Sequence, residues 1–440
     1  MPATPTYPGV YIEEAESSVR PITGVATSVT AFVGYTGRGL DNRATQLFSF
    51  ADFERAFGGL VSDSELSYAV QQFFLNGGSN AIVVRVPKSD AAAAAVTLED
   101  GLAGGAKKAL KLTALSKGAW ANSLVADIDH GVPAGDAKAF NLTVTDLGTG
   151  TVERFADVTL DNSKTNYVVA VVNDPGKGSS LVRADAVDTA AGRAAQTGTV
   201  GGDITMSDIK NDKDYTLKIS LDVPSGAVAG AEVTIVAVGE SVPTSILGLG
   251  QLIERKLNLA IAALADGIRV RCVPSASGNG LRLWADVDPA VQPGAVDAII
   301  TLAAGTTNDI GATLKLIANT TPKNVARYRL GLGRAVAGQV DPVAGVDGTQ
   351  LPKTNELIGS ELDRTGIYAL ETVDLFNLLS IPDATRAAAG NPAAHDSAVD
   401  ANSVYDAALA YCTRRRAFLL IDPPPEVASV AAAVDWISGG

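Results

Sequence analysis

Two acidic residues lie where an α/β protein usually places its chemistry. Asp383 and Asp422 each follow a short apolar run that is typical of a strand. The carboxyl ends of parallel strands form the edge at which ligands bind, so a carboxylate pair there can hold a metal or act as a general acid. An Asp before Ala-Thr or Pro also initiates turns and caps helices. Because no histidine or glycine loop lies nearby, we favour the turn and cap role.

Other motifs with known chemistry are weak or missing. The segment "GLGRAVAG" (331–338) is similar to a dinucleotide-binding loop, but Val336 stands where that motif needs glycine and no strand precedes it directly. The P-loop, the nucleophile elbow and the HExxH zinc motif do not occur. We therefore expect neither a cofactor nor a metal site.

The amino-acid composition limits further which class of protein this is. The 440 residues are 46% hydrophobic and 5% aromatic, as in a soluble globular protein of two to four domains. The net charge of −13 argues against a nucleic-acid partner. Cys272 and Cys412 are far apart, and His130 and His395 are the only histidines, which disfavours a disulfide framework and a histidine metal cluster. No signal peptide or membrane-spanning run is visible.

The segment 21–90 has the pattern of one α/β unit. Its expected elements are a strand at 28–34, a helix at 48–59, a second helix starting near 62 and a strand at 81–86. Phenylalanines at helical spacing mark the first helix, and Ser62 with Glu65 predicts a capping box for the second.

The middle of the chain has a different residue pattern. Between 91 and 355, short Val, Thr, Leu and Ile runs alternate with Gly, Asp and Asn turns, which predicts antiparallel sheets. A helix is expected within 244–267, followed by a hairpin built from "IRVRCV" and "GLRLWADV". We interpret this region as one or two β-rich outer domains inserted into the α/β core.

The α/β pattern returns at 356–440. A strand, the helix "SVYDAALAYCTRRR", the strand "AFLLID" and a helix from Glu426 predict right-handed βαβ geometry in a buried sheet. The predicted fold is thus an α/β core, with a mixed sheet flanked by helices, that carries inserted β-rich domains and an extended N-terminal arm at 1–20.

The arm has no packing partner of its own. Pro5 and Pro8 keep "PTYPGVYIEE" (5–14) extended, and its apolar side chains can be buried only against a neighbour, most simply the sheet edge of another subunit. The acidic residues of the segment either remain solvated or form contacts between subunits. The residues assigned to this inter-subunit arm are Tyr7, Pro8, Val10, Tyr11, Ile12, Glu13 and Glu14.

Seven segments in a fixed order resemble one protein family, the contractile tail sheath proteins of myophage tails and related contractile injection systems. They are "PGVYIEE", "RPITGVATSVTAFVG", "FSFADFERAFGG", "LSYAVQQFFLNGGSNAIVVRV", "SKGAWANSL", "TGIYALETVDLFNLLSIPDAT" and "ALAYCTRRRAFLLIDPP". They cover the first ninety and roughly the last eighty residues, whereas the β-rich middle is only loosely similar.

The resemblance implies a structural role rather than an enzymatic one. Sheath subunits form stacked hexameric rings around an inner tube in a metastable extended state. They contract to drive the tube through a target envelope, without nucleotide hydrolysis. The implied partners are other copies of the chain, the inner tube protein and the baseplate and tail terminator proteins, with no nucleic acid and no membrane insertion. Assembly is implied in the bacterial cytoplasm, and terminal arms add strands to neighbouring subunits.

Two further expectations concern the C-terminal part. Arg414, Arg415 and Arg416 form the one basic cluster, which closes a helix C-terminus and can also face an acidic tube surface. Family members continue beyond the position of Gly440 with core strands and a C-terminal arm, so the resemblance implies that this chain lacks part of the family's core.

Two alternative functions remain at this point. An enzyme would need a pocket and a divalent metal at Asp383 and Asp422. A carbohydrate-binding or adhesin module in the middle region would need an exposed aromatic platform, for which Trp120 and Trp284 are the candidates.

Overall fold

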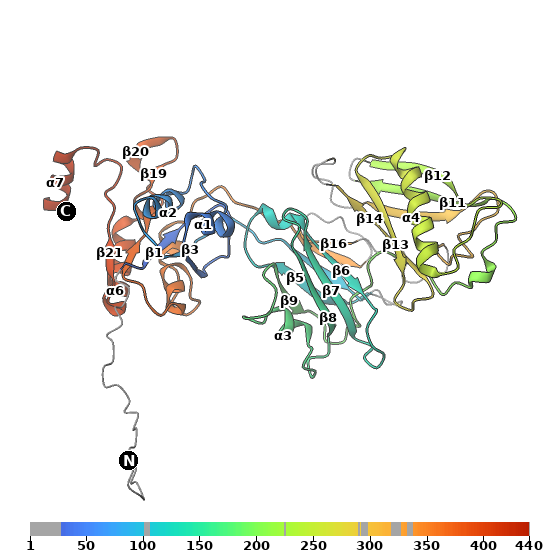
Figure 1. Ribbon diagram of the computed structural model, residues 1–440. Coiled ribbons are helices and arrows are strands. Elements are labelled where there is room, and N and C mark those ends of the chain that lie inside the picture. Colours follow the sequence, from blue (N-terminus) through green and yellow to red (C-terminus); the bar gives the residue numbers. More distant parts are fainter. Residues whose placement is uncertain are drawn as a thin grey trace, which may run out of the picture.

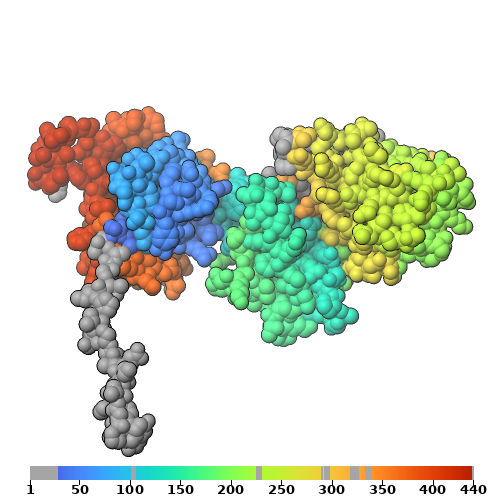
Figure 2. All heavy atoms as spheres, viewed as in Figure 1, coloured from blue at the N-terminus to red at the C-terminus, as the bar shows by residue number. Residues whose placement is uncertain are grey.

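The protein consists of three bodies in a row. The computed structural model describes residues 28–100, 106–223, 226–288, 291, 298–317, 327–331 and 338–439. Figure 1 shows an α/β body that carries the C-terminus, an inner β body beside it and an outer β body at the far end. Figure 2 shows the same sequence of bodies as an elongated molecule. The predicted arm and most of the 331–338 loop lie outside the described residues.

The α/β body is built on a mixed five-stranded sheet from two distant parts of the chain. The strands have the order β2-β3-β1-β18-β21 and span Ala44–Leu47, Ala81–Arg85, Thr30–Gly34, Leu378–Ser380 and Phe418–Leu420. Four of them are parallel, and β2 runs antiparallel to β3. The mixed sheet and the parallel strand–helix–strand unit predicted from the sequence are therefore confirmed.

Helices cover both faces of this sheet. They are α1 (Phe50–Phe57), α2 (Glu65–Leu75), α5 (Thr354–Ile358) and α6 (Ala401–Arg415), with short 3-10 helices η3 (Gly366–Thr372) and η4 (Pro382–Thr385). The last helix of the body, α7 (Val430–Gly439), lies away from the sheet. Successive strand residues point to opposite faces. Phe32 accordingly packs with α1 and α2, while Ala31 and Val33 pack with η3 and α6. Both faces of the central strands β1 and β3 are buried, and these strands are mostly apolar. The predicted burial of the whole sheet is wrong at its edge, where Phe418 and Leu420 of β21 are exposed.

The structure corrects two local predictions. Helix α1 begins after Ser49 and ends at Gly58, as its phenylalanine spacing indicates. Helix α2, however, is capped by Ser64, not by a box of Ser62 and Glu65. The Ser64 hydroxyl accepts from the Ser67 amide and also donates to the Tyr35 carbonyl, a distant partner that no local motif reveals. The last helix starts at Val430, four residues later than predicted. "GIYAL" belongs to η3 and forms no strand.

The inner β body packs two four-stranded sheets around one core. The first has the order β17-β4-β5-β9, with strands at Gln339–Val343, Ala95–Glu99, Lys108–Ala114 and Val182–Ala186. The second has the order β16-β6-β7-β8, with strands at Tyr328–Arg329, Leu124–Asp129, Ala139–Asp146 and Val152–Thr159. Helices η1 (Ala119–Ser123) and α3 (Val168–Val172) complete it. Alternating buried residues of both sheets form the shared core.

The outer β body places one long helix against two three-stranded sheets. The sheets are β12-β11-β15 (Gly226–Val236, Tyr215–Val223, Ile299–Ala304) and β10-β14-β13 (Thr199–Val200, Leu281–Val287, Ile268–Pro274). Helix α4 (Ile246–Ala262) lies on this core, and β13 with β14 forms the predicted hairpin. A 3-10 helix, η2 (Met206–Asp208), and a small ribbon of β19 (Ala387–Ala388) and β20 (Asn391–His395) in the α/β body complete the elements.

The α/β body and the inner β body are joined by a neck of two chain segments, 86–92 and 346–353. The segments are hydrogen-bonded to each other through Ala92 and Val346. Asp90 accepts bonds from the amide and hydroxyl of Thr349 and from the Gln350 amide. Bonds from the Gln350 and Thr349 amides hold the pKa of Asp90 down at about 2. The neck is therefore a paired connection rather than two independent linkers.

A buried ion pair closes the neck from the side of the α/β body. Arg85 at the end of β3 is 2% exposed and pairs with Asp41. Its guanidinium also donates to the Lys117 carbonyl, and the Lys117 amide donates to Asp41 at 2.8 Å. The next residue, Gly118, has φ +136, and a Cβ there would lie 2.9 Å from the Asp347 carboxylate. "SKGAWANSL", one of the resembling segments, thus forms the junction.

Replacing Arg85 by leucine tests the neck. The variant leaves Asp41 in a mostly buried position without its cation, so we expect the free energy of unfolding to fall by about 3–5 kcal/mol. Arg55→Leu is the matched control, because Arg55 pairs with Asp52 at the surface, where an ion pair contributes about 0–1 kcal/mol. Denaturant unfolding measures both, and equal losses would contradict the assigned role.

Candidate assembly surface

The last strand of the α/β sheet has an open edge. On one side β21 pairs with β18, and the Phe418 amide donates to the Asn377 carbonyl at 2.8 Å. On the other side, no strand pairs with β21 in the part of the chain that the structure describes. The side chains there are apolar and exposed, with Phe418 77% accessible and Leu420 and Ile421 about half accessible. An open edge with apolar side chains is a template for another strand.

Helix α7 extends this apolar surface. Figure 1 shows α7 set off from the rest of the α/β body, and Val430, Val434 and Ile437 are largely exposed. A groove of about 910 Å³ runs along α7, β21 and α6. Its apolar lining includes Val399, Tyr405, Leu409, Leu419, Trp436 and Ile437. Large apolar surfaces of this kind mark interaction sites.

The sequence of α6 explains how the groove is formed. Val404, Ala408 and Tyr411 recur at helical spacing and are buried against the sheet, which fixes the orientation of the helix. Leu409 consequently points away from the sheet and is 55% exposed at the groove. The polar rim contains His395, whose amide donates to Glu426 at 2.5 Å.

The three arginines at the end of α6 have different roles. Arg414 forms surface ion pairs with Glu361 and Glu371, at 2.9 and 2.8 Å. Arg415 is mostly buried and donates to the carbonyls of Leu370 and Val373.

Arg416 ends the helix in a left-handed conformation, at φ +57, and its side chain is exposed. Among the described residues it has no ion pair. Of the three, Arg416 is therefore the arginine best placed for an external contact.

Asp383 is a buried structural residue, which corrects its predicted role as a turn or cap residue. It lies inside η4 at 0% exposure, while Ile381 occupies the cap position. One carboxylate oxygen accepts the Tyr35 amide at 2.5 Å, and the other has no hydrogen-bond partner. Gly34 makes this approach possible, because a Cβ there would lie 2.2 Å from the carboxylate.

Burial has the largest effect on the pKa of the Asp383 carboxyl. It raises the pKa of Asp383 to about 7, with Glu65 and Asp63 adding to the increase and the Tyr35 amide and Arg386 opposing it. The folded protein therefore holds a proton on Asp383 between about pH 4 and pH 7 that the unfolded chain has lost.

Asp422 does not form a carboxylate pair with Asp383. It follows β21 and is half-buried, and its backbone exchanges hydrogen bonds with the Tyr405 hydroxyl. It caps no helix, because Ser429 accepts the Ala432 amide at the start of α7. Burial raises the pKa of Asp422, and no hydrogen bond joins it to Asp383, whose oxygens accept only the Tyr35 amide. Across the described residues, no group of three or more His, Cys, Asp or Glu side chains could hold a metal ion.

The remaining candidate residues are structural. Cys272 and Cys412 are buried free thiols in two different bodies. Trp120 packs partly buried against the inner core, and the guanidinium of Arg282 covers the Trp284 ring at 4.9 Å. Arg282 therefore covers one face of Trp284, whereas Trp120 lines a groove of about 730 Å³ beside α1. Among the described helices, none is long and apolar enough to cross a bilayer.

The pH dependence of stability tests the state of Asp383. A carboxyl whose pKa is raised on folding destabilises the protein as the pH rises from about 4 to about 7, on the order of a few kcal/mol in total. Asp383→Asn can keep the bond from Tyr35 but cannot ionise. We expect it to match the wild type near pH 4 and to be the more stable protein at pH 8, in denaturant unfolding. Parallel pH profiles would show that Asp383 does not titrate in this range.

Two solved structures are among those that are similar to this chain. No family model matches the chain, and no curated protein matches it. A sheath tail protein from Listeria innocua is 16% identical over 40% of this chain and 33% of its own length, with a TM-score of 0.25. A sheath tail protein from Desulfitobacterium hafniense is 16% identical over 42% of this chain and 38% of its own length, with a TM-score of 0.21. This chain thus spans little more than a third of each neighbour.

Proposed function

We propose that this chain is a structural subunit of a contractile tail sheath. The observation that carries the proposal is the ordered set of resembling segments, most of which belong to the α/β body. That body also presents the open β21 edge and the exposed apolar groove, as a subunit that is completed by its neighbours requires.

Assembly proceeds by strand addition between copies of the chain. The arm residues 5–14 of one subunit add to the open edge of β21 in the next, and their apolar side chains cover the groove beside it. Main-chain pairing of this kind can hold neighbouring subunits together while one subunit moves relative to the next. Six copies form a ring, and rings stack around an inner tube between a baseplate and a terminator.

The three bodies have different roles in the proposed sheath. The α/β body forms the lattice against the tube, and the two β bodies project outward. The energy for contraction is stored in the extended lattice, so the subunit needs no nucleotide. The alternative enzyme function loses its support because Asp383 is sealed in the core and no hydrogen bond joins it to Asp422.

Deleting residues 2–14 tests the arm. We expect the deletion protein to be a folded subunit with an unchanged circular dichroism spectrum, because the sequence of this segment predicts no core of its own. It should form no stable sheaths in negative-stain images under conditions where the intact protein does. Normal tubes from the deletion protein would refute the proposed arm.

Proline at position 419 tests the edge. Alternate residues of a parallel strand bond to the same neighbour, so the Phe418 amide bonds to β18 and the Leu419 amide points to the open edge. Leu419→Pro removes that outward donor, and proline is tolerated on edge strands. We expect loss of sheath formation with the fold retained. Leu419→Ala is the control, because it shortens the side chain but keeps the amide, and it should still assemble.

Charge reversal at position 416 tests the contact with the tube. If Arg416 pairs with an acidic tube surface, Arg416→Glu should reduce recruitment onto preformed tubes several-fold at low salt, with a smaller effect at high salt. Arg154→Glu, on the exposed side of the inner β body, is the control. Equal recruitment of both variants would leave Arg416 with its helix-ending role alone.

A further inference from the structure

The inner and outer β bodies meet at a cluster of opposite charges. The chain crosses between them twice, once through Thr197 into β10 and once back through Arg327 into β16. Asp127 on β6 of the inner body lies between the two crossings and binds both. One of its oxygens accepts the Thr197 hydroxyl at 3.2 Å, and the other accepts the Arg327 guanidinium at 2.8 and 3.1 Å.

The outer body supplies the opposing side of this cluster. Arg282 on β14 is 8% exposed and donates to the Thr197 carbonyl at 2.6 Å and to the Ile128 carbonyl of β6 at 3.2 Å. Its charge faces Asp127 and Asp129 at 3.9 and 3.6 Å. Arg327 binds Asp127 in the inner body and Asp286 of β14 in the outer body at the same time.

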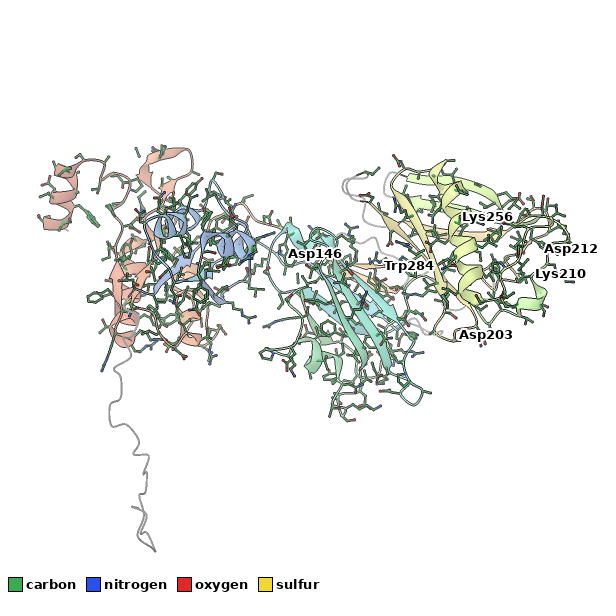
Figure 3. All side chains as sticks on the ribbon, in the orientation of Figure 1. Asp146, Asp203, Lys210, Asp212, Lys256 and Trp284 are labelled. Carbon is green, nitrogen blue, oxygen red and sulfur yellow. The ribbon has the colours of Figure 1, made fainter. Side chains whose placement is uncertain are left out.

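Each arginine therefore connects the two bodies. Figure 3 labels Trp284 near this junction, under the Arg282 guanidinium, and labels Asp212 toward the opposite end of the outer body. Removing one member of a buried charge network leaves its partners without compensation, so such a network holds one arrangement strongly. Among the residues that the structure describes, the apolar cores of the two bodies form separate clusters, and this polar cluster lies between them.

We propose that Asp127, Arg282, Arg327 and Asp286 form a joint that locks the outer β body onto the inner one, so that the two bodies move as a single rigid unit. Asp127 is the central residue because it contacts both crossings and both arginines. The joint lies within one subunit and is independent of sheath assembly.

Distance measurements between the bodies test the lock. Val152 in the inner body and Val238 in the outer body are exposed, whereas both native cysteines are buried, so Val152→Cys with Val238→Cys allows selective spin labelling. We expect one narrow distance distribution in the otherwise wild-type protein. Asp127→Asn and Arg327→Gln should each widen it at least two-fold, with an unchanged circular dichroism spectrum. Arg327→Lys keeps the charge but not the two-sided contact, and should widen it less.

A matched control separates the joint from general charge loss. Asp341→Asn removes an exposed ion pair with Lys108 in the same inner body and should leave the distribution narrow. A broad distribution without any joint substitution would overturn the proposal. So would narrow distributions in all of the folded joint variants, Arg327→Lys included.

Discussion

The buried ion pair between Arg85 and Asp41 is the interaction on which the junction of the α/β body with the inner β body depends. Arg85 ends a central strand of the α/β sheet, and Asp41 also accepts the amide of Lys117 from the inner β body. The buried charge of Arg85 therefore holds the end of β3 and the Lys117 segment together at the neck. A buried guanidinium requires a full set of acceptors, and the carbonyls of Thr36, Gly39 and Lys117 supply the rest.

The two halves of the α/β body are held together by a second long-range contact. The amide of Tyr35, from the first half, donates to Asp383 of the second half, while the Tyr35 carbonyl accepts from Ser64 at the start of α2. One residue therefore links strand β1, helix α2 and η4. This contact explains why a carboxyl group with an unpartnered oxygen is retained in the core, at a position where the neighbouring strand has a glycine.

The inner β body and the α/β body differ in how much apolar surface they leave exposed. In the inner β body, alternating strands bury one face each in a shared core. The α/β body buries both faces of its sheet but leaves the edge of β21 and most of α7 apolar and accessible. In the proposed sheath, contact with a neighbouring copy would bury this apolar area and pair the strand edge.

Local patterns in the sequence determined the layers of this protein, and long-range contacts decided its site residues. Helical spacing predicted α1, α4 and α6, and the β13–β14 hairpin followed from two apolar runs around a turn. These features depend on residues that lie within a few positions of each other, so the spacing of apolar residues is enough to predict them. The burial of Asp383, the choice of Ser64 as cap and the separate roles of Arg415 and Arg416 depend on partners many residues away. Only the folded chain brings those partners within bonding distance.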